Sequence, residues 1–122
     1  MRQRIEVTRG FVDNQKVVLE IGETITEGIN PISTVLVDSD NLAFVYLLDS
    51  DDGYRYVVLN EQLWPLLKEA VDHEMEVVLT DGTTILSLHD MGEEIGYLID
   101  NIKGNSNYGE EMMTRVEEVF VD

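Results

Sequence analysis

The residues best suited to chemistry gather in one polar segment near the C-terminus, residues 101–112. This segment reads NIKGNSNYGEEM and holds three asparagines, a tyrosine and two adjacent glutamates. Such side chains supply amide donors and acceptors, a phenol and carboxylates, which suit a polar ligand or the backbone of a partner protein. Six residues form the candidate binding set: Asn105, Asn107, Tyr108, Glu110, Glu111 and, from an earlier segment, Trp64.

The same segment has a structural interpretation, which we favour. Gly104 is suited to end one helix, and Asn107 with Glu110 is suited to cap the start of the next. A turn between helices needs only one or two such special residues. The segment is therefore either a helix–helix turn or a binding loop.

Clustered aspartates raise the question of a metal site, because carboxylates bind calcium and magnesium. Asp49, Asp51 and Asp52 crowd one loop. An EF-hand loop places glycine sixth and glutamate twelfth. Counted from Asp49, Gly53 comes one position early and the twelfth residue is Asn60. The chain also has no cysteine and its two histidines lack ligand spacing, so we predict no metal site and no cofactor.

The residues best suited to acid–base catalysis are His89, Asp90, Glu93 and Glu94. They fall on the first turns of a predicted amphipathic helix, where the helix dipole favours acids. The sequence has no GxSxG, Walker or GxGxxG motif. We therefore predict that the protein is not an enzyme and assign no catalytic residue.

Charge is the strongest global feature of the chain. Eight basic and 25 acidic residues give a formal net charge of −17. This charge disfavours nucleic acids and anionic membranes as direct partners, and it attracts basic proteins. Solubility is the simpler explanation of the charge. With no signal-like or membrane-length apolar run, the protein is expected to be cytoplasmic.

Alternation with period two predicts six to seven strands in the first two thirds of the chain. Residues 42–48 are apolar on both faces, which predicts a central strand covered on both sides. Asp81-Gly82 lies between two β-rich runs and predicts a two-residue hairpin turn with positive φ at both positions. The predicted strands are residues 2–7, 16–21, 33–37, 42–48, 54–59, 75–80 and 83–88.

Helical spacing predicts one helix inserted among the strands, over residues 61–72, and two helices at the C-terminus. Ser87 and Asp90 form a capping-box-like start for the first of these two, and Asn107 and Glu110 do the same for the second.

Consecutive strands joined by tight turns favour an antiparallel sheet with the helices packed on one face. The predicted fold class is therefore α+β, in a single domain over residues 1–122.

Two further patterns concern surfaces. Gly92 and Gly96 share one face of the predicted helix, which favours close packing against a strand or a second subunit. Tyr54 and Tyr56 share one strand face. A covered sheet face is the first interpretation of this pair, and a partner-binding aromatic patch is the second.

Three segments carry a family resemblance: LWPLLKEA (63–70), YLIDNIKGNSNYGEEM (97–112) and DSDNLAFVYLL (38–48). Together they resemble a family of short, acidic, uncharacterised cytoplasmic proteins from Bacillus-type Gram-positive bacteria. The resemblance covers most of the chain. It implies a bacterial protein of unknown function, and it brings no catalytic residues.

The sequence assigns no specific function, and three hypotheses follow from it. The first is a small acidic, non-enzymatic binding or accessory module that acts through protein–protein contact or self-association. The second is a small-molecule or ion sensor that uses the loop at residues 101–112. The third is a nucleic-acid mimic whose carboxylates imitate phosphates and bind a basic protein.

Overall fold

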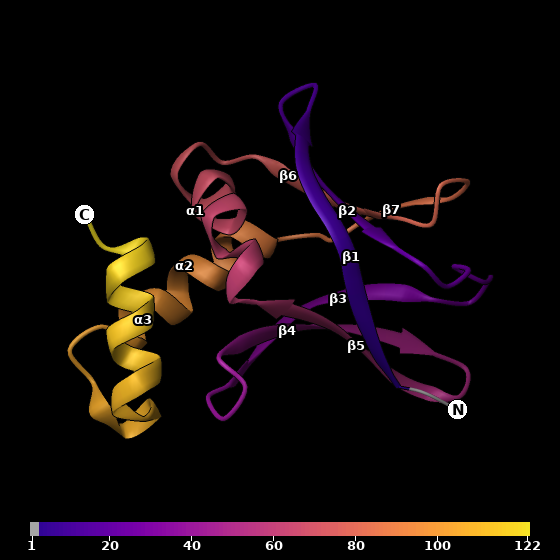
Figure 1. The fold of residues 1–122 in the computed structure, drawn as a ribbon. Coiled ribbons are helices and arrows are strands. Elements are labelled where there is room, and N and C mark those ends of the chain that lie inside the picture. The colour runs from indigo at the N-terminus through magenta and orange to yellow at the C-terminus, as the bar shows by residue number, and fades with distance from the viewer. Residues whose placement is uncertain (1–2) are drawn as a thin grey trace.

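The computed structural model describes residues 3–122 as a seven-stranded sheet with three α-helices gathered on one side of the strands (Figure 1). The predicted order of five strands, a helix, two strands and two helices is confirmed, although residue 2 of the first predicted strand lies outside the described residues. The elements are β1 Arg4–Asp13, β2 Lys16–Ile21, β3 Asn30–Asp38, β4 Ala43–Ser50, β5 Gly53–Asn60, α1 Trp64–Asp72, β6 Glu76–Thr80, β7 Ile85–Ser87, α2 Met91–Ile102 and α3 Glu110–Phe120, with 3-10 turns at Glu61–Leu63 and Ser106–Tyr108.

The sheet is mixed, so the prediction of a purely antiparallel sheet is wrong. Its strand order is β3-β4-β5-β1-β2-β6-β7, and the pairs β1–β5 and β2–β6 are parallel. The other four pairs are antiparallel and join strands that follow each other in the chain. Turn signals identify only such sequential pairs. The two parallel pairs join strands far apart in sequence, where packing of the apolar faces decides the neighbour.

The two faces of the sheet differ in what covers them. On β4, Phe44, Tyr46 and Leu48 belong to the main core together with helix residues. Val45 and Leu47 point to the opposite, outer face, because successive strand residues alternate. Both are buried, so burial on both sides is confirmed for this strand. The helices, however, pack only against the inner face, and Tyr54 on β5 is 51% exposed. The interpretation of a covered tyrosine face is therefore wrong for Tyr54.

Three aromatic rings join the sheet to the helices in the core. The Phe44 ring lies 5.3 Å from the Trp64 ring and 6.0 Å from the Phe120 ring, measured between centroids. Trp64 is fully buried, and its Nε1 donates a hydrogen bond to the Leu59 carbonyl at 3.1 Å. In this arrangement the indole of Trp64 is packing material, and an external ligand does not reach it.

Close packing at the glycine pair of α2 occurs against α1 rather than against a strand. A Cβ placed on Gly92 would lie 3.3 Å from the Ala70 carbonyl oxygen, and one on Gly96 would lie 3.7 Å from a Val71 methyl group. The face of α2 that carries the two glycines is therefore packed against α1.

Both predicted caps of the C-terminal helices are wrong. Ser87 belongs to β7, because the Leu88 amide still donates to the Val77 carbonyl at 2.9 Å and prolongs the strand pairing. Helix α2 therefore begins at Met91, after Asp90. Helix α3 begins at Glu110 after Gly109, whose φ of 97° breaks the chain away from the preceding turn.

Candidate functional site

Several polar groups of the loop at residues 101–112 form hydrogen bonds within the loop or to α3. The Asn105 side chain accepts a hydrogen bond from the Asn107 amide at 3.1 Å and donates one to the Asn101 carbonyl at 3.2 Å. The Gly104 amide donates to the Glu117 carboxylate on α3 at 2.6 Å. These bonds are those of a capped turn between two helices.

The other candidate residues of this loop do not line a common cleft. Asn107, Glu110 and Glu111 are exposed, and Tyr108 packs partly against the core. The cleft described next has no lining residue from 101–112. Trp64 is fully buried in the core, so the six candidate residues do not form one exposed site.

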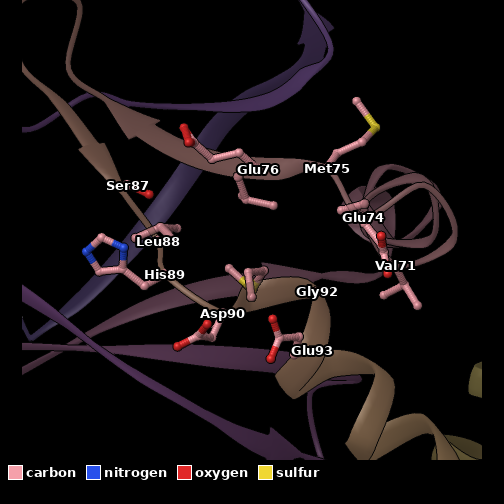
Figure 2. A pocket seen from close by; sticks show the side chains of 13 residues that line it. Val71, Glu74, Met75, Glu76, Ser87, Leu88, His89, Asp90, Gly92 and Glu93 are labelled. Carbon is pink, nitrogen blue, oxygen red and sulfur yellow. The ribbon is translucent and has the colours of Figure 1, made fainter.

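A cleft of about 660 Å³ lies elsewhere, where the end of α1 and the start of β6 face the end of β7 and the start of α2. Figure 2 shows its labelled side chains arriving from both sides. Four carboxylates line it, and we call it the acidic cleft: Glu74, Glu76, Asp90 and Glu93. Within residues 3–122, no lysine or arginine lines this cleft. A cation entering it would therefore meet only negative charge and neutral groups.

Apolar side chains form a smaller part of the lining of the acidic cleft. Val71, Met75, Leu88 and Met91 line it between the carboxylates. Leu88 and Met91 belong to the main core, which fixes the walls. Val71 and Met75 are only partly buried, and they suit the aliphatic stem of a long cationic side chain, whose charged end can then reach a carboxylate.

Two of the four acidic residues of the cleft have a left-handed backbone conformation. Glu74 has a φ of 52° just after α1, and Asp90 has a φ of 62° just before α2. This conformation favours glycine and tolerates aspartate better than glutamate. Glu74 closes the helix end, where the Met75 amide donates to the Ala70 carbonyl at 3.0 Å, a position at which glycine is usual. The chain therefore carries charged residues where glycine would cost less backbone energy.

A buried tyrosine forms a hydrogen bond to the backbone at the rim of the acidic cleft. The Tyr46 hydroxyl donates to the His89 carbonyl at 2.7 Å and accepts from the Ser33 amide at 3.1 Å. Burial raises the pKa of the Tyr46 phenol, so the hydroxyl remains a donor across the neutral pH range. The backbone that presents His89 and Asp90 is thus tied to β4.

Clusters of metal-ligating side chains and membrane-length apolar helices were both sought among the described residues. Within residues 3–122, no group of three or more His, Asp or Glu side chains is placed to hold a metal ion. None of the helices in that range has the length and apolar character needed to cross a bilayer.

The sequence singled out two of the four carboxylates of the acidic cleft. His89, Asp90 and Glu93 were singled out for their chemistry, although as a helix start. Glu74 and Glu76 were not, because they follow a different helix and nothing local links them to residues 89–93. The one available signal was the glutamate shortly after the end of the first predicted helix, in place of the usual glycine.

Residues 5–120 match the family described as "Family of unknown function (UPF0738)". A UPF0738 protein of Bacillus licheniformis is 45% identical over 123 residues, which cover 99% of this chain and all of that protein. The UPF0738 protein YjbL of Bacillus subtilis is 40% identical over 125 residues, with 99% of this chain and 100% of the relative covered. One from Geobacillus kaustophilus is 43% identical over 94 residues, 77% of this chain and 75% of the relative. No solved structure matches the chain.

Proposed function

The chain belongs to the UPF0738 family, whose function is unknown, and we propose that it is a non-catalytic binding module that holds a cationic segment of a partner protein in the acidic cleft. The observation that carries this proposal is the gathering of four carboxylates around one cleft, which the partly buried Val71 and Met75 also line, in a chain of net charge −17. A lysine or arginine side chain has both features to match, an aliphatic stem and a positive end.

The carboxylates of the cleft are largely free to accept such a partner. Glu76 forms an exposed ion pair with Lys16 at 3.5 Å. Within residues 3–122, Glu74, Asp90 and Glu93 form no ion pair. Like charges held around one cleft repel each other, and a bound cation relieves this repulsion. We place this binding in the cytoplasm, as the cysteine-free composition favours.

A matched pair of charge reversals tests the proposal. Glu93 lies in the first turn of α2 and Glu110 in the first turn of α3. Both Glu93→Lys and Glu110→Lys change the net charge by the same amount and place a cation at a helix N-terminus. The probe is a fluorescent oligolysine peptide, and the measurement is fluorescence anisotropy at low and physiological salt.

We expect Glu93→Lys to weaken peptide binding about tenfold or more, whereas Glu110→Lys changes it only slightly. Binding by the parent protein weakens as salt rises, because exposed charges are screened. Equal losses in the two variants would mean that the peptide senses only the total charge, and the acidic cleft would then not be its site.

The two alternatives have weaker support. For a sensor that uses residues 101–112, a thermal-shift screen across metals, nucleotides and amino acids is the test, because a ligand of the native state raises the melting temperature. The engagement of Asn105 with its own loop places this alternative second. A nucleic-acid mimic needs regularly spaced acids along one surface, and the cleft carboxylates come from both of its sides (Figure 2).

A further inference from the structure

The edge of the sheet at β7 leaves backbone groups without a strand partner. β7 is the last strand in the sheet order, and it is paired on one side, with β6. The Leu88 amide donates to the Val77 carbonyl at 2.9 Å, and the Asp81 amide donates to the Thr84 carbonyl at 3.3 Å. Both bonds continue the register of the β6–β7 pair at its two ends. Thr84 and Leu88 therefore turn their backbone groups towards β6.

The residues between these two alternate in direction. In an antiparallel pair every second residue bonds to the neighbouring strand, and the residues between face the other way. Leu86 therefore bonds to β6, whereas the N–H and C=O groups of Ile85 and Ser87 point to the free edge. Within residues 3–122 no strand pairs with that edge. The Ile85 side chain is 70% exposed, so this edge is open to solvent.

The two edges of the sheet differ in how they are protected. Prolines, charged side chains and irregular pairing discourage the addition of a further strand to an edge. The edge strand β3 contains Pro31, and its pairing with β4 is irregular between Pro31 and Val35. Around β7, residues 83–88 read TTILSL, without a charge or a proline. β7 is only three residues long, which limits an added strand to a few hydrogen bonds, so further contacts must hold it.

We propose that an extended, lysine- or arginine-bearing segment of a partner protein adds as a strand to the edge of β7 and places cationic side chains in the acidic cleft. This inference rests on the proposed function and specifies how the segment is held. The strand leads directly into the cleft, because residues 87–90 all line it (Figure 2). Backbone pairing with Ile85 and Ser87 then sets the register of the segment, and the carboxylates bind its charges.

Charge selects a cationic segment over a second copy of this chain as the occupant of the edge. The β7 edges of two copies can pair in principle, but each copy has a net charge of −17, so the two repel each other. A basic segment is attracted instead by Glu74, Asp90 and Glu93, which form no ion pair within residues 3–122. The same acids that repel a second copy attract a basic strand.

A proline at residue 85 tests the edge and leaves the lining of the cleft unchanged. Ile85→Pro removes an outward N–H, which the pairing with β6 does not use, and places a ring where the added strand would lie. Ile85→Val is the matched control, because it also shortens the side chain but keeps the N–H. The probe is a fluorescent peptide of alternating threonine and lysine, since threonine favours an extended chain and lysine supplies the charge. Fluorescence anisotropy measures its binding.

We expect Ile85→Pro to weaken peptide binding at least about fivefold, as loss of a hydrogen bond does, and Ile85→Val to change it less than about twofold. Circular dichroism checks that both variants are folded. Amide hydrogen exchange, followed by nuclear magnetic resonance, gives a second measurement that needs no variant. Saturating peptide should slow exchange at Ile85 and Ser87 about tenfold or more. The amide of Glu111, in the first turn of α3, has no partner in its helix and should keep its rate.

The outcomes separate this inference from the proposed function. Peptide binding that is lost in Glu93→Lys, with unchanged exchange at Ile85 and Ser87, would keep the acidic cleft as the site and overturn strand addition. An absence of peptide binding would overturn both. Exchange at Ile85 and Ser87 that slows without peptide, as the concentration of the parent protein rises, would mean that a second copy occupies the edge, and it would also overturn this inference.

Discussion

The Tyr46 hydroxyl donates a hydrogen bond to the His89 carbonyl at 2.7 Å, across 43 residues of sequence. The same hydroxyl accepts from the Ser33 amide at 3.1 Å, where β3 is irregular and Ser33 has a φ of 56°. One buried phenol is therefore hydrogen-bonded at Ser33, which has a left-handed conformation, and at His89, which precedes the left-handed Asp90. The geometry of the acidic cleft depends on this bond.

Tyr46→Phe removes both hydrogen bonds and keeps the ring. The Ser33 amide and the His89 carbonyl then lose a partner in a partly buried place, which costs about 1–3 kcal/mol of unfolding free energy. Urea denaturation measures this loss. Tyr54→Phe, at a half-exposed tyrosine of the neighbouring strand, is the control and should change stability by less than about 0.5 kcal/mol. Equal effects of the two substitutions would show that the bond contributes nothing.

The two glycines of α2 should respond differently to alanine. Gly96→Ala places a methyl group in ordinary contact with Val71 and should gain up to about 1 kcal/mol of helix stability. Gly92→Ala places it 3.3 Å from the Ala70 carbonyl oxygen, where the backbone of α1 must give way. Thermal and urea unfolding should therefore rank Gly96→Ala as the more stable of the two. The opposite order would mean that α1 and α2 are not packed at Gly92.

Asn105 should matter to stability and Asn107 should not. The Asn105 side chain makes two hydrogen bonds within its turn, so Asn105→Ala should cost about 1 kcal/mol, as loss of a helix cap does. Asn107 is exposed, and Asn107→Ala should be nearly neutral. Unfolding in urea measures both. A neutral Asn105→Ala would remove the structural explanation of this loop and favour the binding interpretation.

A single aspartate should give the fold part of its pH dependence. The Asp81 carboxylate accepts from the amides of Thr84 at 2.7 Å, Thr83 at 2.9 Å and Ile25 at 2.8 Å. These bonds, that of Thr84 first, lower the pKa of Asp81. A lowered pKa in the folded state means that Asp81 adds stability above its unfolded pKa of about 4. This contribution is lost as pH falls through the folded value.

Melting temperatures between pH 7 and pH 3 test this. The parent protein should lose more stability over this range than Asp81→Asn, in which the group no longer titrates. Asp52→Asn, at an exposed hairpin tip, should follow the parent curve. Parallel curves for the parent and Asp81→Asn would contradict the assignment.

The order of the elements could be predicted because each element is defined by its own periodicity. Pro65 illustrates this, since proline is tolerated in the first turn of a helix and α1 begins one residue before it, at Trp64. The hairpin at Asp81-Gly82 was also predicted, but its turn was wrong. The loop runs over residues 81–84 with positive φ only at Gly82, because the Asp81 side chain holds Thr83 and Thr84 in a longer turn.

The acidic cleft could not be predicted as a unit, for a physical reason. Glu74 and Glu93 face one cleft only because α1 and α2 pack closely at Gly92. That contact depends on the tertiary arrangement, including the parallel pairing of β2 with β6. The glycine spacing of α2 predicted close packing without naming α1 as its partner, and the β2–β6 pairing leaves no local signal in the sequence. The chemistry of the residues was visible, whereas their proximity was not.

The most direct test of the central claim, that the acidic cleft binds a cationic segment, is a nuclear magnetic resonance titration of the isotope-labelled protein with an unlabelled oligolysine peptide. We predict that the amide signals of residues 74–76 and 89–93 shift together with one dissociation constant, while those of Glu110 and Glu111 stay in place. Shifts spread evenly over acidic residues, or confined to 101–112, would contradict the claim.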